Sequence, residues 1–342
     1  MTGGAGYIGS HAIKRLLRAG HDVVVLDNLD RGNIEAIELL REHTGHPVPF
    51  AEGEVGDFEL VSDVLHEHRV EAVMHFAALA YVRESVNEPV RYYRNNTAGS
   101  ITLLNACLEQ GITRFVFSST CATYGEPDPS LIPITESCPQ APINPYGWSK
   151  LFFERVLLDA QDNLVHDGIP FAYAALRYFN VAGCDTEGVL GEDHDPETHI
   201  IPIALEVAQG TREQLTIFGN DRPTPDGTCV RDYIHVDDLV DAHVRVLEAL
   251  DPHDEDKMRL IYNLGNGEGF SVRQIADAVK RVTGVPIEVA DAPSNPADPP
   301  TLTASAQKIE RELGFTPAIT DLDEIIRSAW EWMQKHPQGY AS

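Results

Sequence analysis

The sequence predicts an α/β protein built on a doubly wound parallel sheet, with a second, smaller α/β lobe. Short apolar runs alternate with helical patterns through the first half of the chain, which is the order of parallel strands joined by crossover helices. A glycine-rich turn opens the first of these helices. The second half is richer in proline and glycine, which indicates a less regular lobe over the carboxyl edge of the sheet.

Each element rests on its own local pattern. Continuous apolar runs predict four buried strands and a weaker fifth, which are residues 23–26, 72–76, 114–117, 171–176 and 48–51. Amphipathic patterns that end at a glycine predict helices over residues 7–19 and 90–110. Further along, residues 232–250 and 260–263 again read as a helix and a strand. We therefore expect a Rossmann-like first domain over 1–180 and a mainly substrate-binding domain over 181–342, from which about 232–263 returns to the first.

The charge balance narrows the choice of partners. Fifty-three acidic residues against 26 basic ones give a net charge of -27, which repels nucleic acid and anionic membranes. The sequence has no apolar run of about 18 residues and no basic segment followed by an apolar one at its start. The five cysteines lack zinc or redox spacing, and no His/Cys/Asp cluster predicts a metal. We expect a cytoplasmic protein with reduced thiols, no metal, and no nucleic-acid or membrane partner.

The turn at the start of the chain predicts a dinucleotide site. Gly3, Gly6 and Gly9 lie three apart, so that backbone amides and the positive end of the helix can approach a pyrophosphate. Asp27 closes the next strand 18 residues after Gly9, where a carboxylate can accept hydrogen bonds from the adenosine ribose. Because a carboxylate repels a 2'-phosphate, NAD is favoured over NADP, although Arg31 nearby leaves NADP open. A glycine-rich turn without a ligand is the simpler alternative.

The chain begins directly at this turn, whereas such a turn ordinarily follows the first strand of the sheet. That strand lies mid-sheet, and without it both neighbours keep unpaired backbone groups, which cost about 1 to 3 kcal/mol each if buried. We therefore expect that the start is misassigned and that Met1 stands where a strand-ending valine would be. Intact-mass measurement on protein from its natural source tests this, because a mass matching residues 1–342 contradicts it.

A tyrosine and a lysine four residues apart predict the catalytic pair. Asn144 and Pro145 form a helix start, so that Tyr146 and Lys150 fall on one face of the helix. An ammonium beneath a phenol favours the phenolate, which allows the phenol to act as a base. Thr120 ends the strand that precedes this helix. Its hydroxyl can hydrogen-bond the substrate oxygen from which Tyr146 takes the proton. A surface tyrosine packed on a lysine stem, and a threonine that merely caps a turn, are the alternatives.

At these residues the sequence resembles the extended short-chain dehydrogenase/reductase superfamily and, within it, the UDP-glucose 4-epimerases. The resemblance covers essentially the whole chain. Its carriers are TGGAGYIGSH, DNL from 27, HFAA from 75, YYRNN from 92, FSSTCATYG from 117, NPYGWSK from 144, RYFNVAG from 177, GEDHDPETHIIP from 191, FGNDRPTPDGTCVRDYIHV from 218 and HPQGY near the end.

The resemblance implies tightly held NAD, interconversion of UDP-glucose and UDP-galactose through a 4-keto sugar, and a homodimer. It implies Tyr146, Lys150 and Thr120 as catalytic residues. The implied cofactor contacts are Gly3, Gly6, Tyr7, Ile8, Gly9, Asp27, Asn28, Glu54, Val55, Phe76, Ala77, Ala78, Asn95, Lys150 and Phe179. The implied substrate contacts are Thr120, Asn180, His199, Phe218, Arg231, Asp298 and Leu302.

Some positions depart from the pattern of these epimerases. Asn295 stands where they usually have a phosphate-binding arginine, which places more of the diphosphate on Arg231. Glu54 replaces an aspartate near the adenine, and His199 replaces an asparagine that faces the sugar. Leu302 lies where the substituent on sugar C2 turns over. Its intermediate size predicts preference for a C2 hydroxyl over an acetamido group, although leucine at this position as mere core filling is an equal alternative.

Three other functions remain open. A related dehydratase would need an acid pair directly after Thr120, but Cys121 and Ala122 follow it. Another UDP-hexose or UDP-uronate 4-epimerase would carry the same motifs. A non-catalytic NAD-binding sensor could keep the fold, because a fold does not fix a function, but it would have no use for the Tyr146 and Lys150 pair.

Overall fold

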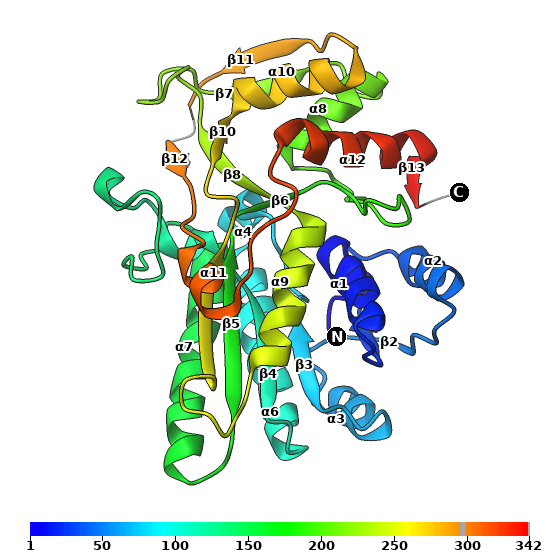
Figure 1. The fold of residues 1–342 in the computed structure, drawn as a ribbon, viewed down its shortest axis with the longest axis vertical. Coiled ribbons are helices and arrows are strands. Elements are labelled where there is room, and N and C mark those ends of the chain that lie inside the picture. Colours follow the sequence, from blue (N-terminus) through cyan, green and yellow to red (C-terminus); the bar gives the residue numbers. More distant parts are fainter. Residues whose placement is uncertain (295–298, 341–342) are drawn as a thin grey trace.

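The structure is a computed structural model that describes residues 1–294 and 299–340. A parallel sheet forms its lower part, and a second lobe stands over the carboxyl ends of the strands (Figure 1). In the sheet β2 pairs with β1, and β3, β4, β5 and β9 follow in that order, all in parallel register. Their bounds are β1 Val25–Asp27, β2 Phe50–Glu52, β3 Ala72–His75, β4 Arg114–Thr120, β5 Ala172–Tyr178 and β9 Arg259–Leu264. The predicted fold class is confirmed.

Thr2 links the two parts of this sheet. It bridges Leu26 of β1 on one side and His75 of β3 on the other. Its amide donates to the Met74 carbonyl at 3.0 Å, and the Leu26 amide donates to the Met1 carbonyl at 2.9 Å. The glycine-rich turn therefore leaves the sheet between β1 and β3, where the direction of the strand order reverses and doubly wound folds bind their ligands.

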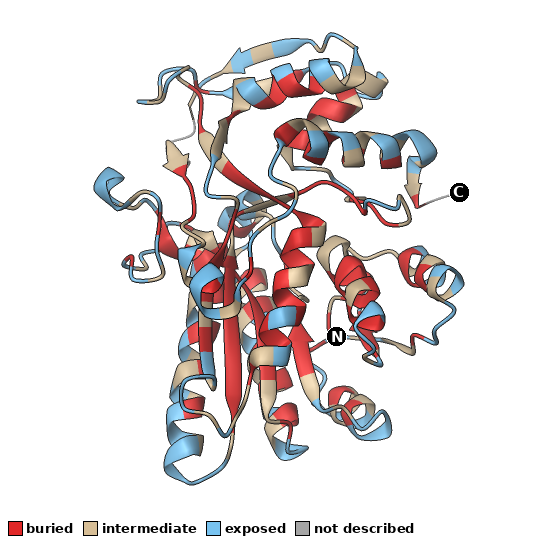
Figure 2. Cartoon of the chain, in the orientation of Figure 1, coloured by how far each residue is buried: buried red, intermediate tan, exposed pale blue. Residues whose placement is uncertain are grey.

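Helices cover both faces of the sheet, since alternate strand residues point to opposite sides. Met74 and Val116 pack with α1 (Tyr7–Arg18), α2 (Ile34–Thr44) and α9 (Val236–Ala249) on one face. Val73, Phe115 and Phe117 pack with α3 (Phe58–Glu67), α6 (Ser100–Glu109) and α7 (Pro145–His166) on the other. Strands β3, β4 and β5 between these two layers are almost wholly buried (Figure 2).

Two predicted helices have different bounds. The expected helix over 90–110 is divided into α5 (Pro89–Tyr92), the π-helix η1 (Tyr93–Gly99) and α6, and such π turns are frequent at functional sites. The helix expected from 232 begins at Val236, because residues 230–235 pair as strand β8 and the His235 side chain caps the helix.

The second lobe is built around β8. This strand pairs with β10 and β12 and also with β6, while β7 pairs with β11. The strands are β6 Asn180–Ala182, β7 Leu215–Phe218, β8 Val230–His235, β10 Gly269–Ser271, β11 Val289–Ala292, β12 Thr301–Leu302 and β13 Pro337–Tyr340. The remaining helices are α4 Val82–Asn87, η2 Cys121–Tyr124, η3 Pro129–Leu131, α8 Ile200–Gln209, α10 Val272–Thr283, α11 Gln307–Leu313 and α12 Leu322–Lys335.

A buried ion pair fixes α7 to the middle of the sheet. Arg177 on β5 donates to Glu154 on α7 at 2.6 Å, and both side chains are at most 7% exposed. Arg177 also donates to the Tyr124 hydroxyl at 3.0 Å, which in turn donates to Asn263 of β9 at 2.7 Å. Removal of one partner would leave a buried charge without compensation, which costs about 3 to 5 kcal/mol.

Within the described residues, no helix is long and apolar enough to cross a membrane. The five cysteines are free in the same part of the chain.

We predict that His75 makes the fold sensitive to acid. Its ring contacts the Thr2 hydroxyl at 2.6 Å and the Ser100 hydroxyl at 2.7 Å, and burial lowers the pKa of the imidazole to about 3. Below pH 6.5 the unfolded chain therefore binds a proton that the folded protein does not, and the unfolding free energy falls as the pH falls.

The test is urea unfolding between pH 5 and 6, above the isoelectric point of 4.7. In the variant His75→Gln the unfolding free energy should depend less on pH, by about 1.2 kcal/mol per pH unit, because one proton uptake is removed. The other buried histidines are present in both proteins, so their contributions to the difference in pH dependence cancel. Equal slopes in the two proteins would contradict the prediction.

Candidate active site

A large cavity lies between the two lobes at the carboxyl edge of the sheet. All fifteen residues that the sequence analysis assigned to the cofactor line this one cavity. Of the other expected site residues, six that belong to the catalytic set or the substrate set line it too, and five of these are Thr120, Tyr146, Asn180, His199 and Arg231. Leu302 completes the wall. The motifs are far apart in sequence, so their convergence is a property of the fold.

The glycine-rich turn fits a pyrophosphate. Gly3 has φ +69°, and a Cβ on it would lie 2.5 Å from the Ala77 nitrogen. A Cβ on Gly9 would lie 2.0 Å from the Gly3 carbonyl oxygen, so only glycine allows this close packing. Helix α1 begins after Gly6, and no side chain caps its first amides. These amides, together with the positive end of the helix, form a site for an anion.

Asp27 provides the acceptor for a ribose. Its two carboxylate oxygens accept the amides of Ala5 and Leu29, each at 2.9 Å, which fixes the carboxylate at the cavity wall. Each oxygen keeps a further lone pair for a ligand hydroxyl. Burial raises the pKa of the Asp27 carboxyl, while the amide hydrogen bonds act in the opposite direction. Asn28 next to it donates to Glu54 at 3.1 Å. These residues and the turn together fit a dinucleotide.

The catalytic triplet comes from β4 and α7. Asn144 caps α7 by accepting the Gly147 amide at 2.8 Å, which starts the helix in the register that the sequence predicts. Lys150 Nζ donates to the Ser118 carbonyl at 2.8 Å and lies 4.9 Å from the centre of the Phe117 ring. Thr120 follows at the end of β4 and lines the same cavity as Tyr146 and Lys150. The three expected catalytic residues therefore meet in one place.

Burial acts on both members of the Tyr–Lys pair. It raises the pKa of the Tyr146 phenol well above 10, and the Thr120 hydrogen bond acts in the opposite direction. It lowers the pKa of the Lys150 ammonium to about 7, although the Glu154 carboxylate favours the charged form. The sequence spacing indicated only the attraction between the two groups, whereas the structure shows that burial disfavours the charged form of each. A positive charge in the cavity lowers the pKa of a phenol, and the oxidised nicotinamide ring carries one.

Asn96 is a site residue that the sequence analysis missed. It lies on the π-helix η1 beside Asn95, and it is buried. Its side chain accepts the Leu79 amide and donates to the Leu79 carbonyl, both at 2.9 Å, and donates to Ser149 at 3.1 Å. Asn96 thus fixes the cavity loop that contains Ala77 and Ala78. The pair of asparagines was visible in the sequence, but nothing there showed that only one of them faces the cavity.

The substrate side of the cavity is organised by strand β8. Leu302 of β12 is the register partner of Arg231 on β8, so the two residues are neighbours on the cavity wall. The next residue, Asp232, accepts amides from three separate segments, those of Ala304, Asn266 and Gly267. Burial raises the pKa of Asp232 to about 6, while these three bonds act in the opposite direction. Asp232 therefore holds the segments behind Arg231 together.

Three positions that were named from the sequence, Phe218, Asp298 and Asn295, are not among the described residues that line the cavity. Phe218 ends β7 with 41% of its surface exposed and does not line the cavity. The Arg83 guanidinium lies 4.3 Å from the centre of its ring. The place of Arg83 was not predicted from the sequence. Asp298 and Asn295 lie outside the described residues, and their roles stay predictions, as does that of Phe218.

The model of the NAD dependent epimerase/dehydratase family matches residues 1–265. The chain belongs to this family. The membership covers both the glycine-rich turn and the Tyr–Lys pair, and it confirms the expected resemblance and the expectation of NAD as cofactor.

Curated and structurally known relatives cover the chain from end to end. A UDP-glucose 4-epimerase of Lacticaseibacillus casei is 47% identical over 99% of this chain and 98% of its own length. A probable UDP-arabinose 4-epimerase of Arabidopsis thaliana is 44% identical over 100% of this chain and 82% of its own. The solved structure of a UDP-glucose 4-epimerase from Bifidobacterium longum with NAD+ and UDP has a TM-score of 0.92. It is 38% identical and covers 99% of this chain and 98% of its own.

Proposed function

We propose that this chain catalyses the reversible 4-epimerisation of UDP-glucose and UDP-galactose with bound NAD. One observation carries the proposal: Tyr146, Lys150 and Thr120 meet in the same cavity as the complete set of expected cofactor residues. The full-length identity to UDP-glucose 4-epimerases supports the same reaction. An assay of UDP-galactose conversion tests it.

Tyr146 is the group that moves the proton. Its phenolate takes the proton of the sugar C4 hydroxyl, and Thr120 bonds the same oxygen and so fixes its direction. The glycine-rich turn and Asp27 would hold NAD, which would supply the acceptor for the C4 hydride, and return of that hydride to the opposite face of the sugar would invert C4. Tyr146 then gives the proton back to the C4 oxygen. The reaction has no net redox change and requires no second substrate.

Lys150 acts on the Tyr146 phenol from the next turn of α7. Its bond to the Ser118 carbonyl holds the ammonium one helical turn from Tyr146, in a region that excludes water. A positive charge on this lysine favours the charged form of a nearby phenol. Because the pKa of Lys150 is about 7, its side chain can gain or lose a proton near neutral pH.

The nucleotide is held by the second lobe while the sugar turns over. Arg231 and Asn180 line the cavity on that side, and we assign them to the UDP part of the substrate. In this scheme residues 1–180 bind NAD, residues 181–342 mainly bind the substrate, and about 232–263 belong with the first domain. The pairing of β9 with β5 and the packing of α9 on the sheet support that division.

A UDP-pentose is the second candidate substrate. The plant relative named as a probable UDP-arabinose 4-epimerase aligns with 100% of this chain and with 82% of its own length. The chemistry at C4 would be the same, because Tyr146 and Thr120 act on the C4 oxygen and not on the group at C5. A related dehydration stays disfavoured, since Cys121 and Ala122 offer no acid pair after Thr120.

The charge and the cysteines of the chain bear on its macromolecular partners and its cellular compartment. The net charge of -27 supports the absence of nucleic-acid and anionic-membrane partners. Free cysteines, four of the five buried, support a reducing compartment, and we infer the cytoplasm.

We also propose that the chain forms a homodimer through the α5, η1 and α7 surface. Trp148 and Phe152 lie one turn apart on α7 with 37% and 44% of their surface exposed, and their rings are 5.4 Å apart. The Tyr93 ring lies 5.9 Å from that of Phe152, and Val90, one turn before Tyr93, is 74% exposed. An apolar group of this kind on a highly charged protein indicates an interface.

The first prediction of the function concerns Tyr146. The variant Tyr146→Phe should lose at least about 100-fold in kcat for UDP-galactose, because the general base is removed, and should keep bound NAD. The matched control is Tyr93→Phe, which removes a hydroxyl outside the cavity and should keep the wild-type rate. A Tyr146→Phe enzyme with more than about a tenth of the wild-type rate would refute the role of this phenol.

The second prediction concerns the group at sugar C2. Leu302 is 8% exposed and packs in a small cluster with Phe179 and Ile134, so it cannot move aside easily. We expect kcat/KM for UDP-N-acetylgalactosamine to be about 5- to 150-fold below that for UDP-galactose, since the acetamide would stay unpaired. In the variant Leu302→Ala the kcat/KM values for the two substrates should be closer to each other. Equal values in the wild-type enzyme would show that Leu302 does not control the pocket.

The third prediction concerns the dimer. A charge at the centre of the apolar surface should separate the subunits, so Phe152→Glu should sediment as a monomer while the wild-type protein sediments as a dimer. The control Phe58→Glu changes a phenylalanine on α3 that is exposed to a similar extent, 37%, and should stay dimeric. A dimeric Phe152→Glu protein would place the interface elsewhere.

A further inference from the structure

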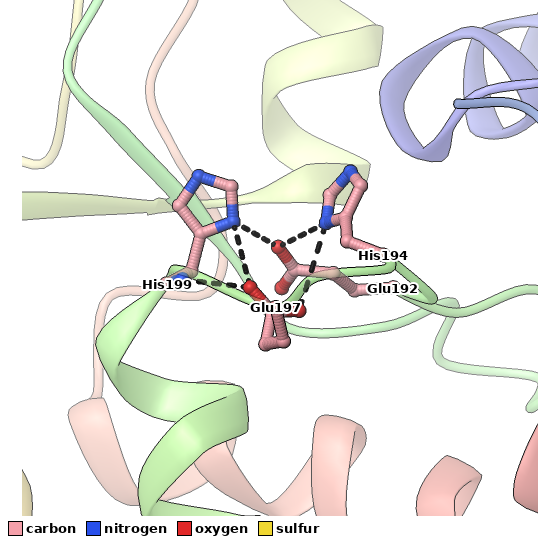
Figure 3. A group of neighbouring side chains, drawn as sticks. All are labelled: Glu192, His194, Glu197 and His199. Atoms are coloured by element: carbon pink, nitrogen blue, oxygen red, sulfur yellow. Dashed lines mark hydrogen bonds and ion pairs between the residues drawn. The ribbon is translucent and has the colours of Figure 1, made fainter. Parts of the chain in front are cut away.

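Four potential metal ligands converge in the segment between β6 and α8. Glu192, His194, Glu197 and His199 each direct one nitrogen or oxygen atom toward a common point (Figure 3). These four atoms all lie within 4.8 Å of one another. No metal was expected from the sequence, because the chain lacks the cysteine and histidine spacings that are typical of zinc sites.

The contacts in this cluster have the distances of a coordination shell. His199 Nδ1 lies 2.7 Å from Glu192 Oε1 and 3.4 Å from Glu197 Oε1, and His194 Nδ1 lies 3.3 Å from Glu192 Oε1 and 3.6 Å from Glu197 Oε2. A tetrahedral zinc ion with ligands at about 2.0 to 2.1 Å separates them by about 3.3 to 3.4 Å. One of the four contacts is shorter than this, two agree with it, and the fourth, to the other oxygen of Glu197, is slightly longer.

These contacts do not form a satisfied hydrogen-bond network. Glu192 Oε1, His194 Nδ1 and His199 Nδ1 are buried from solvent, and none of the three has a partner in hydrogen-bond geometry. The Glu192 side chain is only 5% exposed. Buried polar atoms that face one another without hydrogen-bond geometry are costly, and a cation at their centre would satisfy all of them.

Surrounding groups hold the ligands in place, as outer groups do at metal sites. Glu197 Oε1 accepts the amides of Thr198 and His199, both at 2.6 Å, which orients its carboxylate. The His194 ring packs edge to face against the rings of Tyr7 and Tyr81, at 6.1 and 6.2 Å between centres. The site is therefore preorganised before any ion enters.

We propose that Glu192, His194, Glu197 and His199 bind one divalent metal ion of the zinc type in a closed, structural site. Two imidazoles exclude magnesium and calcium, which take oxygen ligands, and favour zinc or a similar transition metal. Two carboxylates balance the charge of a dication while both imidazoles are neutral. Four protein ligands leave no open position for catalysis at the ion.

The ion would fix one wall of the active site. His194 and His199 line the cavity, and the Nε2 atom of His199 points away from the cluster (Figure 3). When Nδ1 binds a metal, the proton must stay on Nε2, so His199 presents a defined donor. The metal would thus set the hydrogen-bonding character of a residue that we assign to substrate contact. Metal binding itself does not depend on the proposed reaction.

The test uses the full chain freed of metal with a chelator and titrated with Zn²⁺ alone by calorimetry near neutral pH. We expect one ion per chain, and Co²⁺ at the same site should give the intense visible absorption of four-coordinate cobalt. Glu192→Gln and His199→Gln should each weaken binding at least about 100-fold, since each removes a direct ligand. His166→Gln, an exposed histidine on α7, should bind as the wild type does.

Several results would overturn the proposal. If the wild-type chain takes up no stoichiometric zinc, the four residues form only an ionic network. If Glu192→Gln and His199→Gln bind zinc as tightly as the wild type, the ion lies elsewhere. The His199 side chain is 42% exposed, so its variant should fold even if a change at the buried Glu192 does not.

Discussion

A single buried hydrogen bond, from Lys150 Nζ to the Ser118 carbonyl at 2.8 Å, determines how the active site is assembled. It joins α7 to β4. Tyr146 precedes Lys150 by one helical turn and Thr120 follows Ser118 by two residues, so the bond sets both reactive groups together. Four residues further along α7, the Arg177–Glu154 ion pair joins the helix to the neighbouring strand β5. The chemistry of the site depends on the distance between one helix and one strand.

Burial of this junction changes the pKa values of Lys150 and Tyr146 and disfavours the charged form of both side chains. In the absence of water the Lys150 ammonium is less stable, with a pKa of about 7, and the Tyr146 phenolate is disfavoured. The pair becomes a base when a further positive charge enters the cavity. The arrangement therefore links the proton chemistry to a bound, oxidised cofactor, which suits an enzyme that takes and returns the same two electrons.

The sequence predicted the parts of the site that depend on local patterns. The glycine-rich turn, Asp27 and the Tyr–Lys spacing place residues relative to a strand end or a helix face, and all of them line the cavity. What it could not predict depends on contacts between distant segments. The Leu302–Arg231 pairing arises between β12 and β8, and Phe218 is turned outward beneath Arg83. The Glu/His cluster needs a loop conformation that no helix or strand period describes.

In the proposed mechanism the C4 hydrogen leaves and returns as a hydride without exchange with water. The most direct measurement is conversion of UDP-galactose that carries deuterium at C4, in ordinary water, with the product examined by mass spectrometry. We expect UDP-glucose that keeps the deuterium at C4. Product that has lost the label to solvent would show that C4 is deprotonated instead, and would contradict the mechanism.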